Sequence, residues 1–157
     1  YGATKLCAEK LFINANQLSG AKGTKFSVVR YGNVIASRGS VIPFFKELVE
    51  KKAKFLPLTH KDMTRFFITL ADSVEFVFDN LKGNSGGEIS IPKMNSILIQ
   101  DLIKLISAKI KIKIVGVRPG EKLHEILYSK DESDQVYETK NSFKIYPNYN
   151  IEQKKNW

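Results

Sequence analysis

Apolar residues alternate between helical spacing and short β-rich stretches along this chain. Residues 1–18 repeat apolar positions at helical spacing, which predicts a first helix. Residues 25–31 (KFSVVRY) are mostly apolar and rich in β-formers, as is typical of a buried parallel strand. Gly32, Asn33 and Val34 follow at the carboxyl end of that strand, which is where open α/β sheets bind their ligands. This end of the sheet is therefore a candidate binding edge.

The rest of the chain continues the alternation of strands and helices. Ser40 is a predicted N-cap with Pro43 in the following first turn, and Thr69 to Asp72 resembles a capping box with Asp in place of Glu. The strand–helix alternation predicts an α/β fold. We predict helices over 42–52, from 69–72 to 82, over 97–107 with Asn95 or Ser96 as cap, and from 121 to 126, with strands over 55–59, 65–68, 86–92 after a turn, 111–117 and 142–146.

Composition narrows the class of protein. The length of 157 residues fits one ordinary domain, and 43% hydrophobic with 11% aromatic residues fits a packed core. Cys7 is the single cysteine, which excludes an internal disulfide framework and favours a reducing cytoplasm. No run approaches the roughly 18–20 apolar residues of a membrane span, and the first residues do not form a signal peptide.

The net charge of +9 could indicate nucleic acid or an anionic surface. The lysines are scattered, however, and they do not alternate with aromatic residues as a platform for single strands requires. We therefore predict no nucleic-acid partner and interpret most lysines as solvated. His60 and His124 lack ligand spacing, so we predict no metal site.

The first five residues hold a candidate acid/base pair. Tyr1 and Lys5 are four residues apart, and on a helix this spacing places both on one face. An ammonium beside a phenol favours the phenolate and lowers its pKa from about 10, which makes a usable base. The alternative is a surface pair, because Tyr-x-x-x-Lys occurs by chance in many helices. The chain has no initiator methionine, and we expect it to be part of a longer protein.

Five segments, taken in order, resemble one family. The segments are Tyr1 to Lys5 (YGATK), Arg30 to Val34 (RYGNV) continuing into Ser37 to Pro43 (SRGSVIP), Met63 to Phe66 (MTRF), Gly86 to Ile89 (GGEI), and Arg118 to Glu125 (RPGEKLHE). Together they resemble the C-terminal half of the extended short-chain dehydrogenase/reductases that act on nucleotide sugars. Within this resemblance, Tyr1 favours the branch of soluble inverting UDP-N-acetylglucosamine 4,6-dehydratases of pseudaminic acid biosynthesis, because the larger membrane-bound relatives typically carry Met there.

The resemblance implies a domain organisation. Residues 1–37 would be the end of an NAD(P)-binding Rossmann domain, with a parallel sheet, and 131–157 a C-terminal tail. Residues 38–130 would form mainly a smaller α/β subdomain for the nucleotide sugar, with 55–82 returning to the Rossmann sheet. The chain contains no Gly-rich dinucleotide fingerprint, so that loop would precede residue 1.

The resemblance also implies catalytic roles. Tyr1 would take the proton of the sugar C4 hydroxyl while NADP (or NAD) accepts hydride, and Lys5 would bind the nicotinamide ribose and keep Tyr1 anionic. Elimination of water would use a Lys and an Asp upstream of residue 1. The implied cofactor-binding residues are Tyr1, Lys5, Val34, Ile35, Ala36 and Ser37.

Four residues are the implied substrate ligands. Arg65 and Arg118 would bind the diphosphate, since a guanidinium matches phosphate geometry. Asn33 would bind a sugar hydroxyl or phosphate oxygen, or else end the strand as an Asx-turn, and Glu121 would bind a ribose hydroxyl, or else stabilise the first turn of a short helix. The implied partner is a UDP-sugar, and the implied assembly is a cytoplasmic homo-oligomer. A nucleotide-sugar 4-epimerase and a non-catalytic binding fragment remain alternatives.

Overall fold

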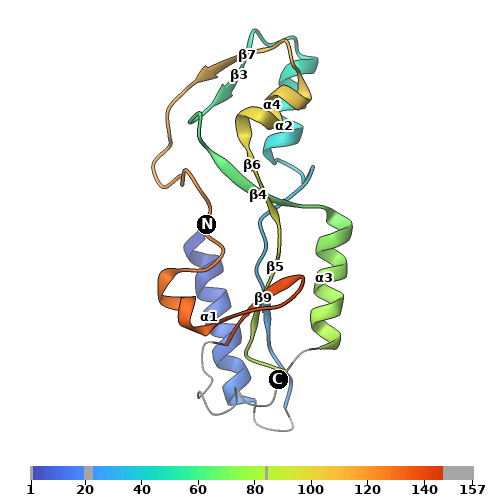
Figure 1. Ribbon diagram of the computed structural model, residues 1–157, viewed down its shortest axis with the longest axis vertical. Coiled ribbons are helices and arrows are strands. Elements are labelled where there is room, and N and C mark those ends of the chain that lie inside the picture. The colour runs from blue at the N-terminus through green and yellow to red at the C-terminus, as the bar shows by residue number, and fades with distance from the viewer. Residues whose placement is uncertain (1, 20–22, 84, 147–157) are drawn as a thin grey trace. The chain divides into compact units, whose positions relative to one another are not determined.

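The computed structural model describes residues 2–19, 23–83 and 85–146 and divides them into two compact units. Unit 1 takes its residues from 1–30, 75–93 and 127–157, and unit 2 consists of 31–74 and 94–126. Each unit is therefore assembled from segments far apart in the sequence. Their strands include parallel pairs, as the α/β fold class predicts (Figure 1). The predicted assignment to a Rossmann domain and a substrate subdomain stays a prediction.

Unit 1 is built on a four-stranded sheet in the order β1-β5-β9-β8. β1 pairs with β5 in parallel, and the two other pairings are antiparallel. All four residues of β5 are buried, which makes it the centre of the unit. The elements are α1 (Gly2–Leu18), β1 (Val28–Val29), β5 (Ile89–Pro92), the 3-10 helix η1 (Lys130–Gln135), β8 (Val136–Glu138) and β9 (Ser142–Ile145).

The helix α1 touches this sheet along a narrow stripe. Ile13, its one buried residue, packs with Ile89, Ile91 and Ile145 in the core of the unit. Three residues further on, the side-chain oxygen of Asn16 accepts a hydrogen bond from the Phe26 N–H at 3.0 Å. Large apolar side chains remain exposed on the rest of the helix, namely Leu6, Leu11, Phe12 and Leu18.

The predicted turn at Gly86 and Gly87 requires glycine because it passes close to the side chain of Asn16. A Cβ on Gly86 would lie 2.4 Å from the Asn16 side-chain oxygen, and both glycines have positive φ, +91° and +80°. Only glycine adopts such a backbone readily. The Gly-Gly-Glu segment therefore has a packing reason inside unit 1.

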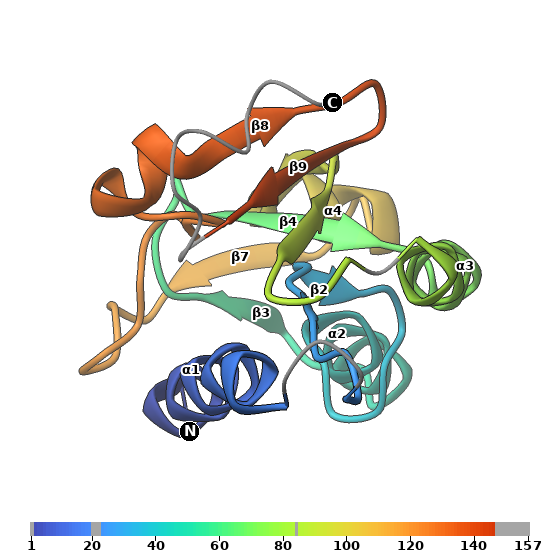
Figure 2. The same ribbon diagram turned by 90° about the horizontal axis from the view of Figure 1, so that it is seen from below.

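Unit 2 contains two small sheets. One has the order β2-β4-β6, with β2 parallel and β6 antiparallel to β4, and the other pairs β3 with β7 in parallel. Figure 2 shows β3 and β7 side by side with α2 next to them. The elements are β2 (Asn33–Val34), α2 (Val41–Glu50), β3 (Phe55–Leu58), β4 (Thr64–Ile68), β6 (Asn95–Leu98), α4 (Ile99–Ile106) and β7 (Lys111–Ile114).

The core of unit 2 lies between its sheets and helices. Leu56 and Ile103 are fully buried at its centre, and Ile112, from the Lys-Ile alternation of β7, packs against it. The predicted pattern of one wet and one apolar face holds for Lys111 and Ile112 but not for Ile114, which is 54% exposed. The buried members of this core are Phe45, Leu56, Leu58, Met63, Phe67, Ile99, Leu102 and Ile103.

The helix α3 (Leu70–Lys82) begins in unit 2 and continues in unit 1. Its predicted start is confirmed, because Thr69 accepts a hydrogen bond from the Asp72 N–H at 3.0 Å and donates one to the Asp72 carboxylate at 2.6 Å. Its apolar face is largely exposed in this chain, with Val74, Val77, Phe78 and Leu81 all at least 39% exposed.

Two local predictions are wrong. Ile97 and Leu98 belong to β6 and not to the following helix, which begins at Ile99 with Leu98 as its N-cap. Residues 121–126 form bends and irregular chain in place of the predicted short helix. The predicted strand 25–31 is also shorter in the structure, and β2, β8 and η1 had no counterpart in the prediction.

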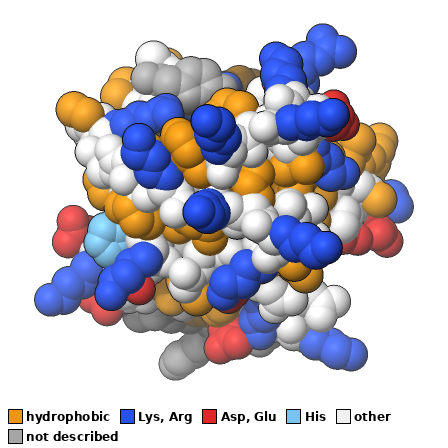
Figure 3. Space-filling view, turned by 90° about the horizontal axis from the view of Figure 1, so that it is seen from above, with side chains coloured by type: hydrophobic (Ala, Val, Ile, Leu, Met, Phe, Trp, Pro, Cys, Tyr) orange, Lys and Arg blue, Asp and Glu red, His pale blue; other side chains and the backbone are white. Residues whose placement is uncertain are grey.

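The surface agrees with the scattered lysines of the sequence. Figure 3 shows Lys and Arg side chains spread among apolar and uncharged ones on the face that it presents. None of the described helices has both the length and the apolar character that crossing a membrane needs.

Candidate functional site

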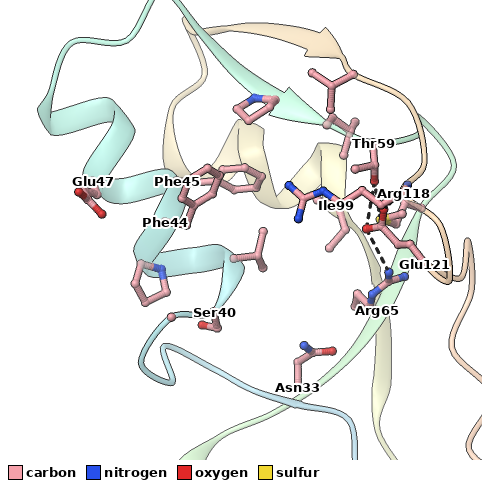
Figure 4. A pocket seen from close by; sticks show the side chains of 17 residues that line it. Asn33, Ser40, Phe44, Phe45, Glu47, Thr59, Arg65, Ile99, Arg118 and Glu121 are labelled. Carbon is pink, nitrogen blue, oxygen red and sulfur yellow. Dashed lines mark hydrogen bonds and ion pairs between the residues drawn. The ribbon is translucent and has the colours of Figure 1, made fainter. Parts of the chain in front are cut away.

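Unit 2 contains a cavity of about 500 Å³, within the size range of small-molecule sites. All four residues that the sequence predicts to bind substrate, Asn33, Arg65, Arg118 and Glu121, line it. Figure 4 shows Asn33 and Ser40 near one end, with Thr59, Arg118 and Glu121 gathered near the other. These residues come from 33, 65 and 118–121 of the chain, so the fold brings distant predicted residues into one site.

Asn33 is positioned by an unusually close approach of two strands. It begins β2 and lies opposite Phe67 of β4. A Cβ on the preceding Gly32 would meet the Phe66 carbonyl oxygen at 2.6 Å, so only glycine fits there. The side chain of Asn33 is exposed at the cavity, where its amide can both donate and accept hydrogen bonds.

Arg65 is held tightly by the segment after β7. Its Nη1 donates to the Thr64 carbonyl at 2.7 Å and the Leu123 carbonyl at 3.1 Å, and its Nη2 donates to the Lys122 carbonyl at 3.0 Å. Two carboxylates lie nearby, Glu125 at 3.5 Å and Glu121 at 3.9 Å. Arg65 therefore fixes the 121–125 segment as well as lining the cavity.

Arg118 differs from Arg65 because its side chain is exposed. The turn Arg118 to Glu121 is closed by its own backbone, with the Glu121 N–H donating to the Arg118 carbonyl at 3.0 Å and Gly120 at φ +79°. The Glu121 carboxylate in turn accepts the Arg118 N–H at 3.1 Å and the Thr59 hydroxyl at 3.4 Å. Among the described residues, no carboxylate pairs with the Arg118 guanidinium, which leaves it open to an anionic ligand.

Much of the remaining wall of the cavity is apolar. Phe44 and Phe45 lie on it with their ring centres 5.7 Å apart, and Pro57 and Val115 contribute further apolar surface. A site that combines such a wall with two guanidinium groups, one amide and the carboxylates of Glu47 and Glu121 suits a ligand that is partly aromatic, partly anionic and rich in hydroxyls. The sequence did not indicate Thr59, Ser40 or the two phenylalanines as site residues, and it predicted Ser40 only as a helix N-cap.

The predicted cofactor residues lie in both units. Val34 ends β2, and Ile35 to Ser37 form an exposed turn in unit 2 in which Ala36 has φ 58°. Two backbone hydrogen bonds fix this turn. The Ile35 N–H donates to the Ile68 carbonyl at 2.9 Å, and the Ser37 N–H donates to the Val34 carbonyl at 3.2 Å. Lys5 is exposed on α1 in unit 1, and Tyr1 lies outside the described residues.

The two histidines take local partners. His124 Nδ1 lies 2.8 Å from the Thr64 hydroxyl, and His60 Nδ1 accepts the Asp62 N–H at 3.2 Å. Within the described part of the chain, no three His, Cys, Asp or Glu side chains group as metal ligands.

A family profile described as "Polysaccharide biosynthesis protein" matches residues 1–147. The chain belongs to this family. Over 99% of the chain it is 51% identical to a Campylobacter jejuni protein named UDP-N-acetylglucosamine 4,6-dehydratase (inverting), of which it covers 47%. It is 38% identical over 92% of its length to a Rickettsia bellii protein named UDP-glucose 4-epimerase, of which it covers 43%. The chain thus spans about half the length of the curated relatives that it matches.

Solved structures give the same picture of the family's fold. The X-ray structure of Pen from Bacillus thuringiensis superposes with a TM-score of 0.85 at 38% identity, over 92% of this chain and 47% of that one. A dTDP-glucose 4,6-dehydratase from Streptomyces venezuelae, solved with NAD bound, has a TM-score of 0.69 at 18% identity, over 86% of this chain and 44% of that one. The second likeness concerns the fold alone.

Proposed function

We propose that this chain carries the nucleotide-sugar site of an inverting UDP-N-acetylglucosamine 4,6-dehydratase. The complete enzyme would convert UDP-N-acetylglucosamine to a UDP-4-keto-6-deoxy-hexosamine with inversion at C5. The observation that carries the proposal is the convergence of Asn33, Arg65, Arg118 and Glu121 on one cavity. The 51% identity to a protein of that name supports the choice of substrate.

The cavity residues have distinct roles in the proposal. Arg118 binds the diphosphate with its open guanidinium, and Arg65 adds positive charge beside it while holding the 121–125 segment in place. Glu121 binds a ribose hydroxyl, because its carboxylate already lies within the turn that bears Arg118. Asn33 binds a hydroxyl or phosphate oxygen of the substrate at the other end of the cavity.

Tyr1 and Lys5 are the proposed catalytic pair. Tyr1 removes the proton of the C4 hydroxyl, and Lys5 favours the phenolate and donates to the cofactor ribose. A nicotinamide cofactor, NADP or NAD, supplies when bound the oxidation at C4 and the reduction at C6. Lys5 fits a role beside such a group, since its exposed ammonium can donate hydrogen bonds to ribose hydroxyls. Elimination breaks the C5–H and C6–O bonds, and the C5 proton leaves with the C6 hydroxyl as water. When C6 is then reduced, C5 takes up a proton on the opposite face, which balances the proton that Tyr1 removed from the C4 hydroxyl.

The proposed setting is a cytoplasmic homo-oligomer in the route to pseudaminic acid and flagellin glycosylation. A nucleotide-sugar 4-epimerase is the second candidate, because the chain is also 38% identical to a protein named UDP-glucose 4-epimerase. An epimerase would use the same Tyr1 but would not release water.

The test is direct. The complete gene product is incubated with UDP-N-acetylglucosamine and NADP or NAD, and the products are analysed by mass spectrometry. A UDP-sugar lighter by one water molecule is expected. A 4-epimer of unchanged mass would instead establish the second candidate. Unchanged substrate would indicate a protein that binds the nucleotide sugar without converting it. Tyr1→Phe should abolish turnover and keep UDP binding. The matched control Tyr128→Phe should retain turnover, because Tyr128 has no proposed catalytic role and its ring, which packs on Phe143, is kept as phenylalanine.

A further inference from the structure

Unit 1 contains an arginine whose side chain is completely engaged by protein groups. Arg30 makes five hydrogen bonds, one for each of its N–H donors. It binds Glu9 through both carboxylate oxygens at 3.0 and 2.7 Å, binds Glu132 likewise at 3.1 and 3.0 Å, and donates to the Leu127 carbonyl at 2.6 Å. We call Glu9, Arg30 and Glu132 the Arg30 cluster. Bidentate pairs of this kind specify geometry as well as adding attraction.

The Arg30 cluster joins three separate elements of unit 1. Glu9 is on α1, Arg30 follows β1, and Glu132 is on η1. The backbone of Arg30 is fixed to the sheet, because its N–H donates to the Ser90 carbonyl at 2.8 Å. Glu132 is fixed as well, because its carboxylate accepts the Ser129 N–H at 2.8 Å in a capping box. Because Arg30 and Glu132 are each fixed by other hydrogen bonds, α1 is the element that the cluster orients.

The position of Glu9 on α1 connects the cluster to Lys5. Lys5, Glu9, Ile13 and Asn16 are spaced by four, four and three residues, so they lie along one face of the helix. The last three attach this face to the rest of unit 1, Glu9 through Arg30, Ile13 through the core and Asn16 through Phe26. Of these three attachments, Glu9 lies nearest Lys5, one helical turn or about 6 Å along the axis.

Apolar packing orients this turn poorly. Ile13 is the one buried residue of α1, and Leu6, beside Lys5, is 55% exposed. The contacts of Phe12, Ile13 and Asn16 all lie in the second half of α1, so they orient the turn of Lys5 less directly than Glu9 does. A displacement of about 1 Å in a catalytic group can lower a rate about 100-fold. The charged attachment at Glu9 therefore orients the turn next to Lys5.

We propose that Arg30 is a positioning residue for Lys5, which it holds through Glu9 on the face of α1 that carries both residues. This inference rests on the proposed function for its catalytic consequence. It predicts that weakening the cluster lowers kcat while KM for the UDP-sugar changes little, because the side chains that line the substrate cavity belong to unit 2.

The test compares variants of the complete gene product. Arg30→Lys keeps the charge but loses the planar fork, and we expect kcat to fall about 10- to 100-fold with KM within about threefold. Glu132→Gln is a milder variant, for which we expect a fall of about three- to tenfold in kcat. The matched control is Glu138→Gln, which removes the exposed unit 1 pair with Lys93 and should leave kcat unchanged.

Two further measurements separate positioning from general stability. In a Lys5→Met background, Arg30→Lys should lower the residual kcat no further, because the group that it positions is gone. Hydrogen exchange should be faster at the α1 amides from Lys5 to Glu9 in Arg30→Lys and unchanged in β5.

An unchanged kcat in both Arg30→Lys and Glu132→Gln would overturn the inference, as would an equal loss with and without Lys5. The exchange measurement does not require activity. If the wild-type protein released no water from its substrate, the proposed function would fail, while slow exchange of α1 that depends on Arg30 would still support the Arg30 cluster.

Discussion

The two units are stabilised in different ways. Unit 2 encloses eight buried apolar residues in one core, with its cavity beside them. Among its described residues, unit 1 encloses four buried apolar residues in its core and exposes most of α1. It adds the Arg30 cluster, which joins α1, the end of β1 and η1. The comparison indicates that unit 2 is stabilised mainly by apolar packing, which depends little on pH. Unit 1 relies more on charged hydrogen bonds, which are lost when a carboxylate is protonated.

The largest effect is expected from a cavity in the core of unit 2. Ile103→Ala removes a fully buried side chain and should lower the free energy of unfolding by about 2–5 kcal/mol. The matched control on the same helix is Leu105→Ala, whose side chain is 81% exposed and whose effect should stay within about 0.5 kcal/mol. Denaturant unfolding of the complete gene product at several pH values measures both. Equal losses in the two variants would show that unit 2 does not depend on this core.

A smaller effect separates the two arginines of the cavity. Arg65→Met removes the hydrogen-bond donor of three carbonyls and the charged partner of two carboxylates. It should lower the free energy of unfolding by about 2–4 kcal/mol in addition to weakening UDP binding. Arg118→Met should weaken UDP binding at least about tenfold with stability unchanged, because its guanidinium is open. Calorimetric titration with UDP, beside thermal unfolding, distinguishes the two roles. Loss of stability in Arg118→Met would mean that it supports the fold.

These two arginines also show what the sequence could and could not predict. The resemblance identified Arg65, Arg118, Asn33 and Glu121, and the fold brings all four to one cavity. It gave no indication that the same Arg65 would prevent a helix over 121–126. There the carbonyls of Lys122 and Leu123 bond to Arg65, and Leu123 also accepts the Thr64 N–H, so they are used outside any helical ladder.

The other errors have similar causes. Ile97 and Leu98 continue the apolar pattern of α4, but pairing with Arg65 and Thr64 of β4 makes them a strand. In the Arg30 cluster, Arg30 binds Glu9, which is 21 positions away in the sequence, and Glu132, which is 102 positions away. No local spacing could therefore reveal this cluster. Sequence patterns therefore placed most helices well and failed where long-range contacts compete with a local preference.

The dependence of unit 1 on charge predicts a pH effect. Hydrogen bonds from Arg30, opposed by partial burial and assisted by the Ser129 N–H, lower the pKa of Glu132 from its ordinary 4.5 to about 2. Burial would lower the pKa of Arg30, but its bonds to Glu132 and Glu9 outweigh this and raise it, so it stays charged. A carboxylate whose folded pKa is depressed adds stability above its unfolded pKa and loses it as the pH falls.

Glu132→Gln should therefore be less stable than the wild type above about pH 5, and the difference should shrink as the pH falls toward 2. Because Glu132 is partly solvated, the effect should be smaller than that of Ile103→Ala. Thermal unfolding of both proteins between pH 7 and the lowest pH at which they stay folded measures it, with Glu138→Gln as control. A difference that stays constant over the acid range would assign the loss to packing and not to charge.

The smallest effect concerns backbone strain, which again separates the units. Among the described residues, the two non-glycine residues with positive φ, Ala36 and Lys52, both lie in unit 2. Lys52 directly follows the C-cap of α2 with φ 55°, where its N–H donates to the Val49 carbonyl at 2.9 Å. Glycine is the residue that such a position favours, because a Cβ is strained there. Lys52→Gly should therefore stabilise the protein by about 0.5–1 kcal/mol.

Lys52→Ala is the matched control, since it removes the charge but keeps the Cβ, and its stability should stay close to that of the wild type. Thermal unfolding of the three proteins separates backbone strain from charge. Equal stabilisation by Gly and Ala would attribute the gain to the lost lysine charge in a lysine-rich segment. Stabilisation by Gly alone would show that unit 2 carries backbone strain at the end of α2, which its apolar core offsets.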